Sequence, residues 1–361
     1  MKNHMLKIVV LVLTFTMLVA CGSNVSNGSG KGETDGMDKT LEGELTVYTA
    51  IEEELIPEYL ETFNDMYPNI KLNIVRDSTG VITAKLLAEG KNTQADVVWG
   101  ISASSLLALD GKEMLKGYTP KGSDKILPQY KDSEQPEKWI GNTAYMTGVV
   151  VNKIELEKLN LPIPKTYEDL LKPEYKGLIV MPHPASSGTG YLTVNGWIQI
   201  KGEEKAWNYM RDLHANIGTY THSGSKPAKL SGSGEYPIGI ALVYSGVTQM
   251  QSGAPVEVIL PEEGLGWDVE ANGLINKEDA KNEQLAHAFL DWAITDEVMK
   301  KYYQANGLST MENEFEKPEG FPESVQDKMY KDNNLKWAAE NRDQILEKWD
   351  TEFAGKAEPK E

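Results

Sequence analysis

The chain has 361 residues, a formal net charge of −18 at pH 7 and one cysteine. A strongly acidic surface disfavours nucleic acids and anionic lipid headgroups as partners, because they carry charge of the same sign. One cysteine excludes an internal disulfide and a cysteine cluster for a metal, so the folded state must be stabilised by its hydrophobic core.

The N-terminal segment predicts export and lipidation. Lys2 and Lys7 precede an apolar run from Ile8 to Ala20, and Cys21 follows it directly. This pattern is typical of a lipoprotein signal peptide over residues 1–20, with Cys21 as the acylated residue. The run is shorter than the about 20 apolar residues that a membrane-spanning helix needs. We therefore predict a lipid anchor at Cys21, on the extracytoplasmic face of the cell membrane; the alternative is an ordinary secretory signal with an incidental cysteine.

The next segments predict a flexible tether and two lobes. Residues 21–43 are rich in Gly, Ser, Asn, Asp and Lys, and they contain too few apolar residues to order themselves. About 320 residues remain, which is more than one hydrophobic core usually holds. The predicted lobes are 44–143 with 254–305 and 144–253 with 306–355, followed by a disordered tail over 356–361.

Strand-like and helix-like runs alternate through the first predicted lobe. Strands are expected at 45–50, 70–75 and 95–99, because their residues are β-branched or alternate between apolar and polar. Helical runs are expected directly after them, at 52–64, 81–89 and 102–109. Repeated strand-helix units predict a parallel sheet covered by helices.

A second series of the same kind follows an apolar run at 145–151. Its strands and helices are expected at 178–181, 191–201, 217–221 and 227–230. Further strands are expected at 238–244 and 256–260, and the second of these is expected to return the chain to the first lobe. The predicted fold class is therefore α/β with two lobes, and the ligand site of such a fold lies in the cleft at the carboxyl ends of the strands.

Four turns rich in Ser, Thr and Gly connect strands to helices. They are Ser78-Thr79-Gly80, Ser102-Ala103-Ser104, Ser186-Ser187-Gly188-Thr189 and Ser223-Gly224-Ser225. One such turn is most simply an N-cap. Four of them at successive strand ends indicate a shared site, because helix N-termini offer free N–H groups and about half a positive charge to an anion. The hydroxyls add neutral donors, so the pattern predicts a site for a tetrahedral oxyanion, such as phosphate or phosphonate, with no metal and no cofactor.

Residues of opposite polarity predict contacts to an amine on the same ligand. Glu52 follows the first strand, Tyr244 ends a late strand, and Asp268 lies beside Trp267. A carboxylate forms a charge-assisted hydrogen bond with an ammonium group, and an aromatic face attracts the cation. The alternatives are that Glu52 complements a helix dipole and that Asp268 is a turn aspartate.

Sequence signatures of enzymes are missing. The five histidines, His4, His183, His214, His222 and His287, do not have metalloprotease spacing. Gly188-Thr189-Gly190 lacks the third glycine of a dinucleotide-binding turn and the lysine of a P-loop. The sequence therefore predicts a binding protein that is not an enzyme; the alternatives from other classes are a secreted phosphatase and a surface adhesin.

Six stretches of the chain stand out as a set. They are Val47 to Ala50, Val75 to Glu89, Ala95 to Gly100, Pro184 to Gly190, Tyr220 to Pro227 and Glu263 to Asp268. As a set they resemble the 2-aminoethylphosphonate-binding proteins of ABC importers, within the class that includes ferric-ion-binding periplasmic proteins. The resemblance implies a monomer with a type II periplasmic-binding-protein fold, whose hinged lobes close over the ligand and deliver it to a membrane permease.

The resemblance also implies roles for particular residues. The Ser187-Gly188-Thr189 turn and the turn from Ser223 to Ser225 match the segments that hold the oxyanion in this class. Tyr48, at the end of the first strand, is included among the predicted ligand contacts. The chain departs from the aminoethylphosphonate pattern after Tyr244, where Ser245-Gly246 replaces an expected basic residue.

The iron-binding members of the class provide a contrast. They hold the metal with two adjacent tyrosines soon after a Gly-Glu turn, whereas the comparable place after Gly234-Glu235 reads Val243-Tyr244-Ser245. Tyr302-Tyr303 lies in a late amphipathic run, where neighbouring side chains of a helix point about 100° apart and core packing is the simpler explanation. We therefore predict capture of 2-aminoethylphosphonate; the alternatives are ferric iron and a polyamine.

Overall fold

The computed structural model describes residues 39–353 and 355–359. None of the helices in these two segments is both long enough and apolar enough to span a membrane. The predicted signal peptide and Cys21 lie outside the described residues, and so does most of the predicted tether.

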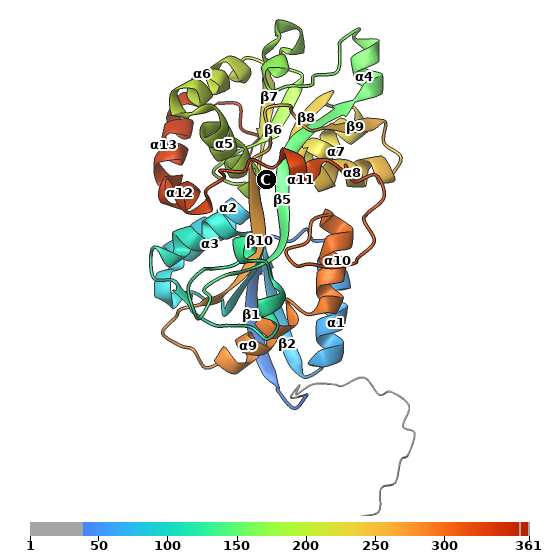
Figure 1. Cartoon of the computed structure of the whole chain (residues 1–361). Helices are drawn as coiled ribbons and strands as arrows, with labels where there is room; N and C mark the ends of the chain where they lie inside the picture. Colours follow the sequence, from blue (N-terminus) through green and yellow to red (C-terminus); the bar gives the residue numbers. More distant parts are fainter. Residues whose placement is uncertain (1–38, 354, 360–361) are drawn as a thin grey trace, which may run out of the picture. The chain divides into compact units, whose positions relative to one another are not determined.

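The first lobe contains the parallel sheet that the strand-helix alternation predicts. Its elements are β1 (Gly43–Thr49), α1 (Ile56–Met66), β2 (Ile70–Arg76), α2 (Thr79–Glu89), β3 (Val97–Ser102), α3 (Ala103–Asp110), β4 (Leu115–Lys116), β10 (Trp267–Ile275), α9 (Glu283–Trp292) and α10 (Asp296–Asn306). β1 lies between β2 and β3 and is parallel to both, while β10 joins β3 in the antiparallel direction. Figure 1 shows α2 and α3 on one side of this sheet and α1 and α10 on the other.

Aromatic side chains fill the space between this sheet and α1, α9 and α10. Phe63, Trp99, Phe289 and Trp292 are fully buried, and neighbouring ring centroids among them lie 4.9 to 5.6 Å apart. Burial of each such side chain contributes roughly 1.5–3 kcal/mol to stability. The first lobe therefore has a core of its own.

The second lobe has the same strand-helix construction. Its elements are β5 (Ile140–Asn152), α4 (Lys153–Lys158), β6 (Ile179–Pro182), α5 (Gly188–Lys201), α6 (Glu203–His214), β7 (Ile217–Thr221), α7 (Lys226–Ser233), β8 (Ile238–Leu242), α8 (Val243–Gln251), β9 (Val256–Ile259), α11 (Val325–Lys328), α12 (Leu335–Glu340) and α13 (Arg342–Phe353). β6 is parallel to β7 and β8, and β5 is antiparallel to β8. A separate core with Trp197, Trp207 and Trp349 packs between this sheet and α5, α6 and α13.

Strand β5 connects the two lobes. Residues 140–146 of this strand pair with β10, and residues 147–152 pair with β8 and β9. The strand order is β2-β1-β3-β10-β5-β8-β6-β7. The carboxyl ends of the parallel strands in both lobes therefore face the boundary that β5 crosses (Figure 1).

Several segments differ from the expectations from sequence. Tyr244 was expected to end a strand over 238–244, but β8 ends at Leu242 and Tyr244 lies in α8. β9 was expected to return the chain to the first lobe, but it pairs with β5 in the second lobe, and β10 makes the return. β10 was not expected as a strand, because Asp268, Glu270 and Asn272 interrupt its apolar pattern. The tail expected to be disordered from residue 356 lies along β7 over residues 356–358, where its backbone pairs with Tyr220.

Candidate functional site

A cavity of about 40 Å³ lies where the strand ends of the two lobes meet. Residues of both lobes form its wall: Ala50, Glu52, Arg76, Ser78, Thr79, Gly100, Tyr145, Ser187, Gly188, Thr189, Ser223, Gly224, Leu242, Tyr244 and Glu270. Ligands of two-lobed α/β proteins bind at such a place, because helix N-termini and strand ends converge there. This cavity is therefore the candidate ligand site.

Two helix N-termini from opposite lobes face each other at the cavity. Ser78 is the N-cap of α2, and its hydroxyl makes no capping hydrogen bond. Ser187 is the N-cap of α5, and its Oγ accepts a hydrogen bond from the Gly190 N–H at 3.3 Å. Their free N–H groups and helix dipoles favour an anion between them.

Glycines allow these two helix ends to approach. A Cβ atom at Gly80 would lie 2.3 Å from the carbonyl oxygen of Ala185, and a Cβ at Gly188 would lie 2.8 Å from the Cβ of Thr79. Both distances are shorter than real Cβ contacts. Side chains larger than hydrogen at these two positions are therefore incompatible with this arrangement of the lobes.

The turn of Ser223 and Gly224 forms a third polar edge of the cavity. The Oγ atoms of Ser223 and Ser225 lie 3.2 Å apart, within hydrogen-bonding distance. A Cβ atom at Gly224 would lie 2.1 Å from Thr189 Oγ1, so the turn packs directly against the N-terminus of α5. Hydroxyl and amide donors from three turns thus surround one small space.

Two carboxylates and one guanidinium lie in the same wall. Arg76 Nη2 donates a hydrogen bond to Glu52 Oε2 at 3.1 Å, and Arg76 Nε donates to the Ile51 carbonyl oxygen at 3.0 Å. The nearest amide donor to Glu270 is Asn306 Nδ2, at 3.4 Å from its Oε2. Burial, and then the charge of Glu52, raises the pKa of Glu270 to about 8. Glu270 therefore lacks a counter-charge that Glu52 already has.

Tyr145 and Tyr244 form an aromatic part of the wall. Tyr145 lies on β5, and Tyr244 lies in the first turn of α8. Burial raises the pKa of both phenols well above 10, and the charge of Glu270 adds to this effect at Tyr244. Both side chains are therefore neutral and carry hydroxyl groups that can donate hydrogen bonds.

Eight of the residues predicted from sequence meet at the cavity: Glu52, Ser78, Thr79, Ser187, Gly188, Thr189, Ser223 and Tyr244. Six others do not line it: Tyr48, Ser102, Ser104, Ser186, Ser225 and Asp268. Ser186 and Ser225 lie just outside, in the wall of an outer hollow that also includes Ser223. The Tyr48 hydroxyl lies under α2, where it donates to Glu89 at 3.2 Å.

Asp268 is used inside the first lobe. Ser104 Oγ donates to Asp268 Oδ2 at 2.5 Å, and the Ser104 N–H donates to Oδ1 at 3.3 Å. Ser102 caps α3 by accepting from the Ser105 N–H. Burial raises the pKa of Asp268 to about 6, although these hydrogen bonds oppose the shift. The aspartate thus holds the N-terminus of α3 against β10, away from the cavity.

Sequence reasoning missed Arg76, Tyr145 and Glu270. Arg76 ends β2, two residues before the first hydroxyl turn, so its position at a strand end was a usable signal. Glu270 lies two residues after Asp268 on a strand that was not predicted, and Tyr145 was treated as an apolar strand residue. Their convergence depends on pairing between β5 and β10, which local patterns do not reveal.

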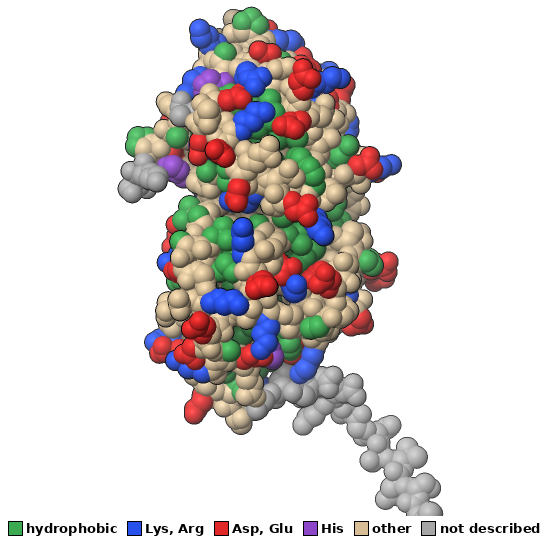
Figure 2. Space-filling view, turned by 90° about the vertical axis from the view of Figure 1, so that its left-hand side faces the viewer, with side chains coloured by type: hydrophobic (Ala, Val, Ile, Leu, Met, Phe, Trp, Pro, Cys, Tyr) green, Lys and Arg blue, Asp and Glu red, His purple; other side chains and the backbone are tan. Residues whose placement is uncertain are grey.

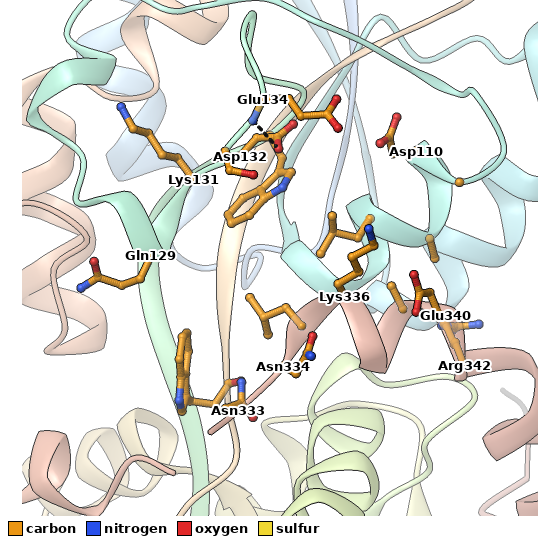
Figure 3. Close-up of a pocket in the computed structure, with 18 of the residues that line it drawn as sticks. Asp110, Gln129, Lys131, Asp132, Glu134, Asn333, Asn334, Lys336, Glu340 and Arg342 are labelled. Atoms are coloured by element: carbon orange, nitrogen blue, oxygen red, sulfur yellow. Dashed lines mark hydrogen bonds between the residues drawn. The ribbon is translucent and has the colours of Figure 1, made fainter. Parts of the chain in front are cut away.

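A larger hollow of about 950 Å³ lies elsewhere, beside α3 and α12 (Figure 3). Charged side chains of both signs line it, among them Asp110, Asp132, Glu134, Lys336 and Glu340. None of the four hydroxyl turns contributes to its described wall. On the face shown in Figure 2, acidic and basic side chains are interspersed, so the negative net charge does not gather into one patch there. The small cavity, and not this hollow, is lined by three of the four hydroxyl turns.

Within residues 39–353 and 355–359, no three His, Cys, Asp or Glu side chains are placed to share a metal ion. The polar groups of the cavity are arranged around a space between two lobes that each have their own core. This arrangement defines a protein that binds a small solute between hinged lobes.

Comparison with known proteins agrees with this class. Residues 92–341 match the family of bacterial extracellular solute-binding proteins, and the chain belongs to that family. It is 29% identical over 340 residues to an uncharacterized protein of Haemophilus influenzae, covering 92% of this chain and 94% of that protein. Membership implies a small-molecule ligand, a permease partner of the ABC type and a location outside the cytoplasm.

Solved structures show the same fold. The periplasmic binding protein AfuA from Actinobacillus pleuropneumoniae, with exogenous fructose-6-phosphate bound, has a TM-score of 0.78 and 27% identity, covering 86% of this chain and 98% of that chain. A ferric binding protein from Campylobacter jejuni has a TM-score of 0.69 and 20% identity, covering 85% and 99%. At 20% identity, the similarity to the ferric binding protein concerns the fold alone. The predicted two-lobed, type II periplasmic-binding-protein fold is confirmed.

Proposed function

We propose that this protein captures 2-aminoethylphosphonate outside the cytoplasm and delivers it to an ABC permease, as a lipid-anchored subunit that is not an enzyme. One observation carries the proposal. The same cavity joins helix N-termini, which suit a phosphonate, to two carboxylates, which suit an ammonium group. The ligand has both groups at a short distance from each other.

The phosphonate end is assigned to the N-termini of α2 and α5 and to the turn of Ser223. The Ser78 hydroxyl makes no capping hydrogen bond, so it is available as a donor. Thr189 is buried beside this turn, in the first turn of α5. Neutral donors and helix dipoles bind an oxyanion despite the acidic surface, because they act over short distances inside a site that excludes water.

The ammonium end is assigned to Glu270, Glu52 and the ring faces of Tyr145 and Tyr244. Arg76 already neutralises Glu52 through their ion pair. Once Glu270 ionises, one negative charge is left without a partner, and the ligand's ammonium group supplies it. Buried carboxylates favour a cation strongly when no other counter-charge is present.

The size of the cavity supports a small ligand. The volume of the cavity is about 40 Å³, which favours a compact ligand over an extended one. A sugar phosphate of the kind bound to AfuA is the second candidate, because that protein is similar along nearly its whole length. It would need the lobes to stand further apart, and its hydroxyl groups would accept a hydrogen bond from a protonated Glu270.

Ferric iron is a third candidate, because Tyr145 and Tyr244 both line the cavity. Metal binding by these phenols requires the loss of their protons, which the raised pKa of each opposes. Arg76 adds a positive charge that repels the ion. The positive charge of Arg76 also disfavours a polyamine. In addition, a polyamine provides no anion for the helix N-termini.

Titration calorimetry of the full chain at about pH 7.5 tests the proposal. Each ligand is titrated in two buffers whose ionisation enthalpies differ, so that the protons released on binding are counted. We expect 2-aminoethylphosphonate to bind more tightly than ethylphosphonate, fructose 6-phosphate, putrescine or ferric ion. We also expect its binding to release most of one proton, because Glu270 must ionise to pair with the ammonium group.

Ethylphosphonate is the matched control ligand, since it has the phosphonate without the amine. It should bind without releasing the proton of Glu270. Tighter binding of fructose 6-phosphate or ferric ion than of 2-aminoethylphosphonate would reject the assignment of the ligand. Glu270→Gln should abolish the proton release and bring the affinity for 2-aminoethylphosphonate down to that for ethylphosphonate.

A further inference from the structure

The segment 355–359 forms an added edge on the sheet of the second lobe. The Tyr220 N–H donates to the Lys356 carbonyl oxygen at 2.8 Å, and the Glu358 N–H donates to the Tyr220 carbonyl oxygen at 2.9 Å. Lys356 Nζ donates to the carbonyl oxygens of His214 and Ile217, at 2.6 and 2.7 Å. The segment is therefore held to both ends of β7, which is the last strand in the sheet order.

The side chain of Glu358 reaches from this edge to the turn that follows β7. Its Oε1 accepts a hydrogen bond from the His222 N–H at 2.5 Å, and its Oε2 pairs with Lys226 Nζ. His222 and Lys226 are the residues directly before and directly after Ser223-Gly224-Ser225. One carboxylate thus connects the two ends of the turn that lines the cavity.

The pKa of Glu358 agrees with this role of its carboxylate. We call its paired contacts with the His222 N–H and Lys226 the clamp. Burial by itself raises the pKa of this carboxyl, but the hydrogen bonds from Lys226 and from the His222 N–H outweigh it, so the pKa lies below its usual value. Glu358 is therefore ionised at neutral pH, and its charge is matched by Lys226. A partly buried, charge-assisted contact of this kind restricts the groups that it joins more than a fully exposed ion pair does.

The turn itself has little room to move while the clamp is closed. Gly224 packs against Thr189 so closely that even a Cβ atom would overlap Oγ1 of Thr189. Ser223 contributes to the wall of both the cavity and the outer hollow. A small displacement of the turn therefore changes the positions of its donors with respect to the N-terminus of α5.

We propose that Glu358 is a positioning residue for the anion site: the strap of residues 355–359 holds the Ser223-Gly224-Ser225 turn from behind, in the geometry that binds an oxyanion. Glu358 makes no contact with the ligand. This proposal rests on the proposed function, because it assumes that the turn contacts the phosphonate.

Three variants of the full chain test the strap. Glu358→Ala removes the clamp, Glu358→Gln keeps an acceptor for the His222 N–H but removes the charge, and Glu352→Gln is the control. Glu352 pairs with Arg211 at 2.7 Å on the exposed surface of α13 and does not touch the turn. Affinities for 2-aminoethylphosphonate and ethylphosphonate are measured by calorimetry, and amide hydrogen exchange is measured in the ligand-free proteins.

We expect Glu358→Ala to weaken both ligands by the same factor, about tenfold, because only the phosphonate end is affected. Glu358→Gln should restore part of this loss, and Glu352→Gln should bind as the wild type does. In ligand-free Glu358→Ala, exchange at residues 222–225 should increase while exchange in α6 stays unchanged. The proton release assigned to Glu270 should also stay unchanged.

Two results would contradict the proposal that the strap holds this turn. One is unchanged exchange at residues 222–225 in Glu358→Ala. The other is faster exchange throughout the second lobe, which would show a general loss of stability. Hydrogen exchange is measured without ligand. It therefore tests whether the strap holds the turn even if wild-type protein fails to bind 2-aminoethylphosphonate. That failure by itself would reject only the proposed ligand.

Discussion

At the scale of single residues, Asp268 and Glu270 show how two acids on one strand acquire different roles. Asp268 accepts hydrogen bonds from the Ser104 hydroxyl and from the N–H groups of Ser104 and Val269. Glu270 has one weak amide donor, and the charge of Glu52 opposes its ionisation. The first acid is satisfied by the protein, and the second has no counter-charge among the described residues.

Glu270→Gln should remove a dependence of stability on pH. Between about pH 4.5 and pH 8 folded wild-type protein keeps the Glu270 proton that the unfolded chain loses, so its free energy of unfolding falls as pH rises through this window. We expect the ligand-free variant to exceed wild type by roughly 3–5 kcal/mol at about pH 9 and to match it at about pH 4. Urea unfolding at both pH values measures the difference, and an equal difference at the two values would contradict the shifted pKa.

Asp268→Ala should damage the fold more than the site. The substitution leaves the Ser104 hydroxyl and two buried N–H groups without an acceptor, which costs about 2–4 kcal/mol of unfolding free energy. The affinity of the remaining folded protein for 2-aminoethylphosphonate should change less than about threefold, because Asp268 does not line the cavity. Chemical unfolding and calorimetry separate the two effects. Full stability combined with lost affinity would place Asp268 in the ligand site after all.

At the scale of secondary-structure elements, the N-termini of α2 and α5 act as a pair. Each has a serine at the N-cap position, yet only their approach creates a site that is closed on two sides. The approach depends on backbone contacts between Gly80 and the carbonyl groups of Ala185 and Ser186. At position 80, helix stability therefore favours alanine, whereas closure of the lobes requires glycine.

Gly80→Ala separates these two demands. Alanine favours a helix over glycine by up to about 1 kcal/mol, so we expect the unfolding free energy of the ligand-free variant to be unchanged or higher. Its affinity for 2-aminoethylphosphonate should fall at least about tenfold, because the added Cβ would lie 2.3 Å from the Ala185 carbonyl oxygen when the lobes close. Gly111→Ala is the control, since its Cβ would meet Ala108 at an ordinary 3.5 Å. Wild-type affinity in Gly80→Ala would mean that ligand binding does not require this contact.

At the scale of the folded lobes, two separate cores are connected by few covalent links. β5, the connection from β9 to β10 and the connection from α10 to α11 cross the boundary. Lys229 of α7 also pairs across it with Glu54 at 3.3 Å on the exposed surface. An exposed pair of this kind contributes little, so it does not hold the lobes together by itself. A ligand that contacts both lobes therefore shifts their equilibrium toward the closed arrangement.

Small-angle scattering can follow this closure. We expect saturating 2-aminoethylphosphonate to reduce the radius of gyration of wild-type protein, because only the closed arrangement brings the N-termini of α2 and α5 to the same anion. Gly80→Ala should show a smaller reduction at matched saturation. A wild-type radius that does not respond to bound ligand would show that the lobes are already closed in its absence.

Local sequence patterns predicted the strand-helix units of both lobes, and they predicted the turns of Ser78, Ser187 and Ser223 at the cavity. Capping residues and alternating apolar residues act over a few positions, so a single sequence displays them. They could not show the hydrogen bond between Asp268 and Ser104, because these residues are 164 positions apart in the chain. Nor could they find the Glu358 clamp, which joins residues 136 positions apart.

The amino-acid sequence by itself determined the class of fold and the supply of hydroxyl-rich turns at strand ends, because both follow from contacts between near neighbours in the chain. The tertiary structure alone decided which acid remains without a partner, which turns share one cavity, and where the last residues lie. Those outcomes depend on strand pairing and burial between distant segments, and the electrostatic energy of a carboxylate such as Glu270 is set by the groups that the fold brings around it.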